Sequence, residues 1–214
     1  MDNQPMARAF AELGAATLGE CGALALPPRV KAAWPGATLA APAFPVRCTA
    51  GDNLGIHVGV ATAPAGSALV VDVGEVAERG YWGEVLTTAA LARGLTGLVI
   101  DGGVRDVAAL ARLAFPAFSS TVALRGATKR ERGTAGRTTV VAGIRVALGD
   151  WVVADADGVV IVPGDALEDV LSAGRARADA EDRYFGSLRG GETTVDLLGL
   201  DASLVDRPDA NEAD

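Results

Sequence analysis

The stretch of sequence that decides the fold reads Leu98-Val99-Ile100-Asp101-Gly102-Gly103-Val104-Arg105-Asp106. Its first three residues form an apolar run with two β-branched side chains, which predicts that residues 98–101 are a strand buried in the protein interior. The glycine pair predicts the turn that leaves this strand, where glycine lets the backbone approach a ligand closely. Arg105 and Asp106 then place a cation and a carboxylate at the end of the strand. Adjacent opposite charges are also common in solvated turns, so this dipeptide alone does not define a site.

The segments on either side complete a β-loop-α-β-loop-α order. Residues 69–73 predict a buried strand, residues 80–84 a loop, residues 85–93 a helix, and residues 107–113 a further helix. In folds of this kind, ligands commonly lie in the loops beyond the strand ends. The loops at 80–84 and 102–106 are therefore the expected position of a site.

The remaining elements follow from turn residues and hydrophobic spacing. Residues 38–48 are apolar but contain Pro42 and Pro45, which predicts a strand at the edge of a sheet. The other expected elements are helices over 6–24, 54–61 and 165–184, an exposed loop over 125–138, and strands over 139–147 and 151–162, the second broken by a tight turn over 155–158.

The composition of the 214-residue chain fits one domain, residues 1–200, followed by a polar and acidic tail, residues 201–214, that we expect to be disordered. The net charge of −8 argues against binding to nucleic acid or to an anionic membrane, because both attract basic surfaces. The N-terminus lacks a signal pattern, and no apolar run reaches the ~20 residues that a membrane helix needs. The expectation is a soluble, cytoplasmic protein.

Few residue types are present for catalysis. His57 is the only histidine, so a multi-histidine zinc site cannot form within one chain, and we interpret it as structural or pocket-lining. Cys21 and Cys48 have no C-x-x-C spacing, and we interpret both as small buried hydrophobes. Carboxylates, arginines and backbone amides remain. That set suits a hard cation such as Mg²⁺, which prefers oxygen ligands.

Gly83 and Glu84 open the helix after the first loop, where unpaired N–H groups attract anions. With the spacing Glu84-x20-Arg105-Asp106, the chain resembles the class II 4-hydroxy-4-methyl-2-oxoglutarate / 4-carboxy-4-hydroxy-2-oxoadipate aldolases. That family shares its fold with the regulator of ribonuclease activity A. The resemblance extends from about Thr17 to Gly190, and its further landmarks are Gly51-Asp52-Asn53, Gly94-x-x-Gly97, Ile100 to Asp106, Phe115-Pro116 and Gly149-Asp150-x-x-x-x-Asp155-x-Asp157-Gly158-Val159.

The resemblance implies a single-domain α/β fold of the swivelling β/β/α type, with a central β core flanked by helices. It implies a homotrimer or homohexamer with sites at the subunit interfaces. Asp106 would be the direct ligand of Mg²⁺, which Mn²⁺ or Co²⁺ could replace. Glu84 would reach the metal through water, as would Glu181 from a neighbouring subunit. Many members carry aspartate at the Glu84 position, so the longer side chain could alter the metal geometry.

The same resemblance implies how a keto-acid substrate binds. Arg105 would hold its carboxylate as a bidentate fork. Gly83 and the amides of Val85 and Leu86 would complete the substrate site. Among these residues, Arg105, Glu84 and Asp106 are the expected catalytic group.

The implied function is a divalent-metal-dependent lyase that cleaves a C–C bond of a 2-keto acid through a metal-stabilised enolate. Its reactions would be the retro-aldol cleavage of a 4-hydroxy-2-oxo acid to pyruvate and the decarboxylation of oxaloacetate. Two alternatives remain: a non-catalytic binding protein like the ribonuclease regulator, or the same site acting on a specialised-metabolism substrate. Glu84 favours an enzyme, because the non-catalytic members lack that acidic residue. Residues 137–141 and 147–149 depart from the family's pattern, which keeps the other substrate open.

Overall fold

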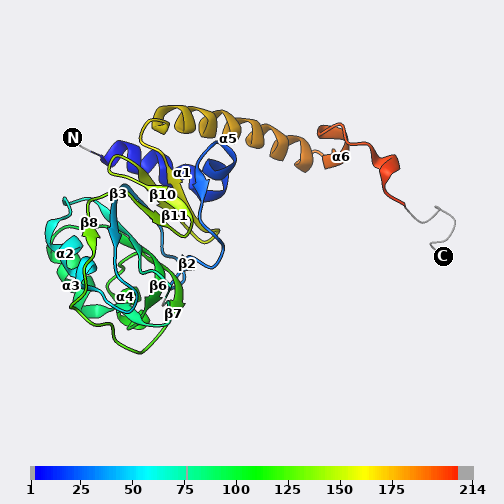
Figure 1. The fold of residues 1–214 in the computed structure, drawn as a ribbon. Helices are drawn as coiled ribbons and strands as arrows, with labels where there is room; N and C mark the ends of the chain where they lie inside the picture. The colour runs from blue at the N-terminus through cyan, green and yellow to red at the C-terminus, as the bar shows by residue number, and fades with distance from the viewer. Residues whose placement is uncertain (1–2, 76, 207–214) are drawn as a thin grey trace. The chain divides into compact units, whose positions relative to one another are not determined.

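The computed structural model describes residues 3–75 and 77–206. The chain divides into two compact units, Met1–Gly174 and Arg175–Asp214. The first unit is a mixed α/β body with a curled sheet (Figure 1), so the expected fold class is confirmed. The helices of the chain are α1 (Gln4–Glu20), α2 (Leu54–Thr62), α3 (Glu84–Ala92), α4 (Val107–Arg112), α5 (Leu167–Arg189), α6 (Thr194–Leu197) and the 3-10 helix η1 (Ala202–Leu204).

The strands form one large sheet and a small hairpin. The large sheet has the order β1-β12-β11-β3-β4-β6-β7-β2, with β5 added beside β6 and β8 beside β3, and β9 pairs with β10. Strands β3, β4, β6 and β7 are parallel neighbours, whereas β11 and β12 run antiparallel. The strands are β1 (Leu24–Ala25), β2 (Lys31–Ala32), β3 (Leu39–Arg47), β4 (Ala68–Asp72), β5 (Gly80–Trp82), β6 (Gly97–Val104), β7 (Ala117–Val122), β8 (Thr134–Ala135), β9 (Thr139–Val141), β10 (Ile144–Val146), β11 (Trp151–Ala154) and β12 (Val159–Val162).

Strand β3 lies in the centre of the sheet, so the edge position expected from its prolines is wrong. Its first half pairs with β11, and the parallel pairing with β4 begins only at Ala43. Pro42 therefore stands just before the β4 ladder. The backbone carbonyl of Pro45 points away from β4 and accepts a hydrogen bond from Gly136 N at 2.9 Å. Neither position requires an N–H donor, which is why a central strand tolerates both rings.

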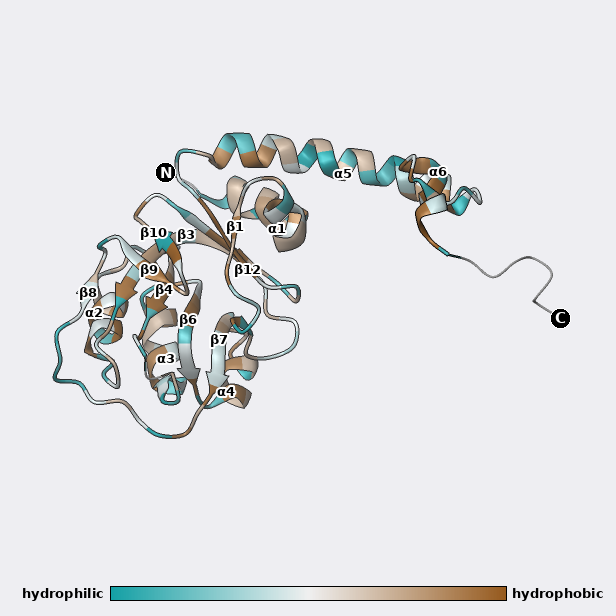
Figure 2. Ribbon diagram, turned by 45° about the vertical axis from the view of Figure 1, so that its right-hand side comes forward, coloured by the Kyte–Doolittle hydropathy of each residue, from teal (hydrophilic) through white to brown (hydrophobic). Residues whose placement is uncertain are grey.

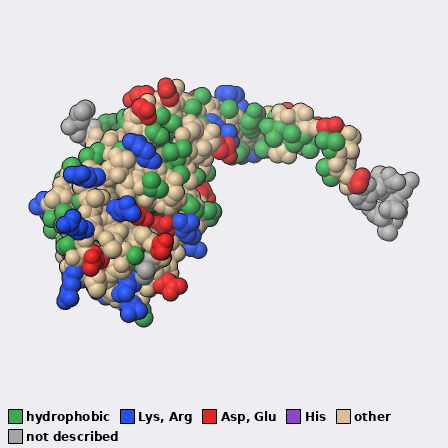
Figure 3. Space-filling view, viewed as in Figure 1, with side chains coloured by type: hydrophobic (Ala, Val, Ile, Leu, Met, Phe, Trp, Pro, Cys, Tyr) green, Lys and Arg blue, Asp and Glu red, His purple; other side chains and the backbone are tan. Residues whose placement is uncertain are grey.

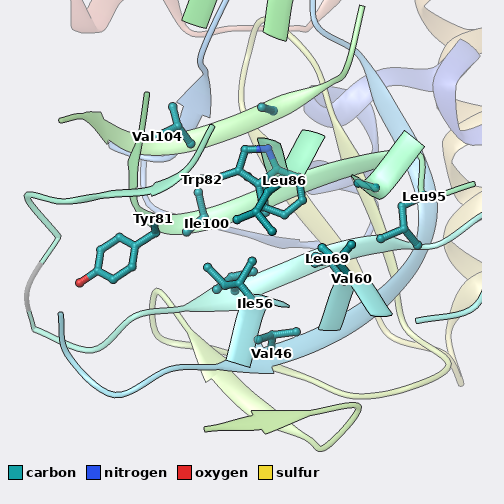
Figure 4. Close-up of a cluster of buried hydrophobic side chains, with 14 of the residues drawn as sticks. Val46, Ile56, Val60, Leu69, Tyr81, Trp82, Leu86, Leu95, Ile100 and Val104 are labelled. Atoms are coloured by element: carbon teal, nitrogen blue, oxygen red, sulfur yellow. The ribbon is translucent and has the colours of Figure 1, made fainter. Parts of the chain in front are cut away.

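The parallel strands carry the main core. Leu69, Leu98 and Ile100 are fully buried, and helices α2 and α3 add Ile56 and Leu86 to the same cluster. Figure 4 shows the Tyr81 ring pointing away from the Trp82 indole, as expected of consecutive strand residues. The loop between β7 and β8 is hydrophobic where it leaves β7 and hydrophilic further along (Figure 2). Lys and Arg side chains are spread among Asp and Glu over the visible face of this unit (Figure 3).

Several local expectations differ from the structure. Residues 139–147, expected as one strand, form the antiparallel β9–β10 hairpin. Residues 80–82 are a short strand rather than a loop, because they pair with the carboxyl end of β6. Strand β6 itself continues through the glycines to Val104, so only Arg105 and Asp106 leave it. Cys48 is buried, and burial raises the pKa of its thiol to about 11, which keeps it protonated; Cys21, by contrast, is partly exposed.

The second unit contains the remainder of α5, followed by α6 and η1. The expected tail falls inside this unit, and its residues 207–214 lie outside the described residues. Among the helices in the described part of the chain, none has both the length and the apolar composition needed to span a bilayer.

Candidate functional site

The two sequence landmarks meet because β5 and β6 run side by side in the same direction. Gly80 pairs with Gly103 and Trp82 with Val104, and Arg105 N donates to Trp82 O at 2.8 Å. The first residue after β5, Gly83, therefore lies beside the residues that follow β6. Gly83 therefore contacts Arg105 and Asp106, although more than twenty residues separate them in the sequence.

Gly83 leaves room for the side chains of Arg105 and Asp106. A Cβ atom on Gly83 would collide with Asp106 Oδ2 and lie 3.0 Å from Arg105 Cγ. Asp106 Oδ2 accepts a hydrogen bond from Glu84 N at 3.0 Å and lies 3.6 Å from Arg105 Nε. Asp106 adopts the left-handed region with φ of 55°, which aspartate tolerates better than most residues. The carboxylate is thus held against the start of α3.

The first turn of α3 offers two further donors. Glu84 N is bound by Asp106, but within residues 3–75 and 77–206 no acceptor lies against the N–H of Val85 or Leu86. Both residues line a pocket of about 220 Å³ together with Arg105. Free N–H groups at a helix start and a guanidinium on the same wall suit a carboxylate. The structure therefore brings Gly83, Val85, Leu86 and Arg105 to one pocket wall.

Further pocket-lining residues come from the start of α2 and from the β7–β8 loop, and of these only Asn53 belongs to a sequence landmark. Asn53, the N-cap of α2, and His57, one turn further along, line the same pocket, as does Lys129 of the β7–β8 loop. Asn53 Nδ2 donates to Tyr81 O at 2.8 Å, which ties α2 to β5. The pocket-lining interpretation of His57 agrees with this position. Lys129 had no signal beyond its basic loop, because only tertiary contacts bring that loop here.

Asp52 holds the start of α2 and the β7–β8 loop together. Its Oδ1 accepts from Leu54 N at 2.8 Å, and its Oδ2 accepts from Arg130 N at 2.6 Å and from Thr128 Oγ1 at 2.8 Å. Burial raises the pKa of the Asp52 carboxyl, but these donors outweigh burial and bring the pKa to about 2. The ionised carboxylate thus fixes the loop that carries Lys129.

We expect Asp52→Asn to destabilise the protein at neutral pH by about 1–3 kcal/mol, because a charged acceptor of several buried donors is lost. Since the folded-state pKa lies below the ordinary value, the stabilisation is present above about pH 4 and is lost as the pH falls through about 2. Urea unfolding at several pH values should show that the free energies of unfolding of wild type and variant become equal in acid. The exposed control Asp157→Asn should change stability by less than about 0.5 kcal/mol. A difference between wild type and Asp52→Asn that does not depend on pH would contradict this role.

The expected metal ligands are only partly gathered. Asp106 Oδ1 has no hydrogen-bond donor among the described residues, whereas Glu84 Oε1 accepts from Arg112 Nη2 at 2.7 Å. Glu181, in the second unit, pairs with Arg177 Nε at 2.9 Å. In the described part of the chain, no three His, Cys, Asp or Glu side chains gather as a metal cluster. One carboxylate with an open oxygen still fits Mg²⁺, which keeps several waters and needs few protein ligands.

The fold and site define an α/β protein with a small-ligand pocket at the carboxyl ends of two parallel strands. The chain belongs to the RraA-like family: the sequence profile of that family, described as Aldolase/RraA, matches residues 14–161. The resemblance drawn from the motifs is therefore confirmed.

Individual relatives agree with this assignment. A protein of Halalkalibacterium halodurans named "Putative 4-hydroxy-4-methyl-2-oxoglutarate aldolase" is 32% identical over 143 residues, which are 66% of this chain and 68% of that protein. A solved structure of an uncharacterized protein from Pseudomonas syringae pv. tomato str. DC3000 superimposes with a TM-score of 0.77 at 26% identity, covering 89% of this chain and 94% of that one. The RNA-processing inhibitor RraA from Thermus thermophilis has a TM-score of 0.60 at 23% identity, covering 76% and 93%, and shows the shared fold alone.

Proposed function

We propose that this protein is a divalent-metal-dependent lyase that cleaves a C–C bond of a 2-keto acid and releases pyruvate. The observation that carries the proposal is the contact of Gly83, Arg105 and Asp106 beside the two unpaired amides of α3. These groups combine an anion-binding wall with a carboxylate that has an open oxygen. The name of the Halalkalibacterium halodurans relative supports the same chemistry.

In this proposal each residue has a definite task. Arg105 and the N–H groups of Val85 and Leu86 hold the carboxylate of the keto acid, which fixes the breaking bond relative to the keto group. Asp106 holds the cation, with Mg²⁺ as the expected ion and Mn²⁺ or Co²⁺ as substitutes. When bound, such a cation withdraws electrons from the keto oxygen as a Lewis acid. Cleavage would leave the electron pair on the three-carbon fragment, which takes up a proton to become pyruvate. The other fragment would leave as carbon dioxide or, after losing its hydroxyl proton, as a carbonyl compound.

We also propose that the site is completed in a homotrimer or homohexamer, with Glu181 supplied by a neighbouring subunit. Large apolar side chains beside the pocket support a subunit contact there. Val85 lines the pocket and is 76% exposed, and Leu124, two residues before the pocket residue Gly126, is 87% exposed. Burying such side chains between subunits would remove apolar surface from water.

We expect pyruvate release from oxaloacetate and from 4-hydroxy-4-methyl-2-oxoglutarate to require Mg²⁺. Exhaustive chelation should lower both rates by at least about 10³-fold, because a Lewis acid contributes several kcal/mol to the transition state. Adding Mg²⁺ or Mn²⁺ back should restore them. A coupled pyruvate assay measures both reactions. Full activity after chelation would overturn the metal mechanism, and no pyruvate from either substrate would favour a binding protein instead.

We expect Gly83→Ala to lower the catalytic efficiency on oxaloacetate by about 10²-fold, because a 1 Å misplacement at a reacting centre can cost that much. The added Cβ must displace Asp106 or the stem of Arg105. The backbone of Gly83 is extended, with φ of −165°, so the substitution adds no backbone strain. Gly186→Ala is the matched control, since nothing lies within 4 Å of its Cβ position. If Gly83→Ala has wild-type catalytic efficiency, the space that Gly83 leaves for Arg105 and Asp106 is not needed for the reaction.

A further inference from the structure

Residues 190–206 of the second unit, which we call the acidic segment, combine exposed apolar side chains with acids. Leu198 and Leu200 are each 54% exposed, Val205 is 65% exposed and Leu204 is 83% exposed. Apolar side chains exposed together in this way usually mark a surface that contacts another molecule. A fitting partner surface would be apolar and basic, because the segment has no base and four acids: Glu192, Asp196, Asp201 and Asp206.

The β7–β8 loop, residues 123–133, has both of these properties. It carries one acid and four bases, and the bases are Arg125, Lys129, Arg130 and Arg132. Val122 and Leu124, where the chain leaves β7, are 58% and 87% exposed. Among residues 3–75 and 77–206, none of the four bases forms an ion pair. The loop thus presents unpaired positive charge beside exposed apolar side chains.

The acidic segment leaves carboxylates available for such a contact. Its side-chain hydrogen bonds join close neighbours, such as Asp196 N to Thr193 Oγ1 at 3.2 Å. In the described part of the chain, the carboxylates of Glu192 and Asp206 have no hydrogen bond or ion pair. Complementary surfaces on different parts of one chain join successive copies, and such contacts close into a ring where the rotation allows it. A second copy therefore offers the basic and apolar surface that the acidic segment fits.

We propose that the acidic segment of one copy docks on the β7–β8 loop of a second copy. Carboxylates of the segment pair with the bases of the loop, and the leucines of the segment pack against Val122 and Leu124. Gly126, Ala127 and Lys129 of the same loop line the pocket of Arg105, so the docked segment lies against the loop that shapes this pocket. Docking of this kind rests on the proposed homo-oligomer, because it joins two of its subunits.

Sedimentation velocity of the full chain, without substrate or metal, tests this docking. Arg125→Glu combined with Arg132→Glu should weaken self-association at least about 100-fold, because acids then face acids. Glu192→Arg combined with Asp206→Arg should weaken it similarly, because bases then face bases. All four substitutions in one chain exchange the two charges, and they should restore association to within about tenfold of wild type. Restoration by the exchange requires that the two surfaces meet.

Arg145→Glu combined with Arg183→Glu is the matched control, since both arginines are exposed and lie outside the two surfaces. This control changes the net charge as much as the loop variant does, and it should leave association unchanged. Leu124→Ser and Leu204→Ser replace side chains that are 87% and 83% exposed, so neither should disturb the fold. Each should weaken association about tenfold, because a leucine that becomes buried on docking is lost.

Three results would overturn the docking: a monomeric wild type, association that survives both charge-reversed variants, or a combined variant that stays dissociated. Docking of the segment on the loop of its own chain would appear as the first of these, since the chain would then sediment as a monomer. A monomeric wild type would also contradict the homo-oligomer, whereas the lyase activity is judged by pyruvate release alone. Failure of the docking and failure of the lyase are therefore distinguishable.

Discussion

Asp106→Asn should abolish Mg²⁺-dependent turnover of oxaloacetate, with a loss of at least about 10³-fold, while the protein stays folded. Asparagine keeps an oxygen to accept from Glu84 N and tolerates the left-handed conformation of residue 106, so only the charge is removed. Alanine would be less informative at φ of 55°, because backbone strain would add to the loss of the ligand. Titration calorimetry with Mn²⁺ should show a matching loss of metal affinity, independent of turnover.

Two further variants are compared with Asp106→Asn. Asp101→Asn makes the same change within β6, where the carboxylate pairs with Arg29 at 2.8 Å, and should keep Mn²⁺ affinity and turnover. Glu84→Gln should cost about 10–100-fold, as is usual for residues that act on a metal through water. Wild-type Mn²⁺ affinity in Asp106→Asn would place the metal elsewhere. If Glu84→Gln has wild-type turnover, the Glu84 carboxylate pairs with Arg112 and has no role at the metal.

Arg105→Lys should lower the catalytic efficiency on oxaloacetate by about 10²–10³-fold, mainly through a higher KM. Lysine keeps the charge but loses the planar fork that matches a carboxylate, and each charge-assisted hydrogen bond is worth about 1.5–3 kcal/mol. The backbone bond from Arg105 N to Trp82 O remains, so the fold should not change. Initial rates over a range of oxaloacetate concentrations separate KM from kcat.

Arg93→Lys is the matched control for Arg105. Arg93 follows the end of α3, where its Nη2 donates to Ala61 O at 2.7 Å, and it is not among the residues that line the pocket of Arg105. The catalytic efficiency of Arg93→Lys on oxaloacetate should stay within about twofold of wild type, because substitutions at exposed positions usually have small effects. If Arg105→Lys behaves like Arg93→Lys, Arg105 does not clamp a carboxylate.

The first wall of the pocket was predictable from sequence because its signals are local. A β-branched run, two glycines and a charged pair predict a strand with a loop at its end, and Gly83-Glu84 predicts a helix start. Both predictions depend only on residues that are close together in the sequence. The central position of β3 was not predictable in this way. Its prolines are unfavourable in most strands, and only the pairing partners show that their missing N–H groups are not needed.

The sequence by itself determined the α/β class, the family and the residues that we propose as a carboxylate site, since spacing and residue type carry that information. The tertiary structure decided what faces them. Asn53, His57 and Lys129 reach the pocket through hydrogen bonds between distant segments, such as Asn53 Nδ2 to Tyr81 O and Arg130 N to Asp52. Long-range contacts of this kind leave no periodic trace in a single sequence.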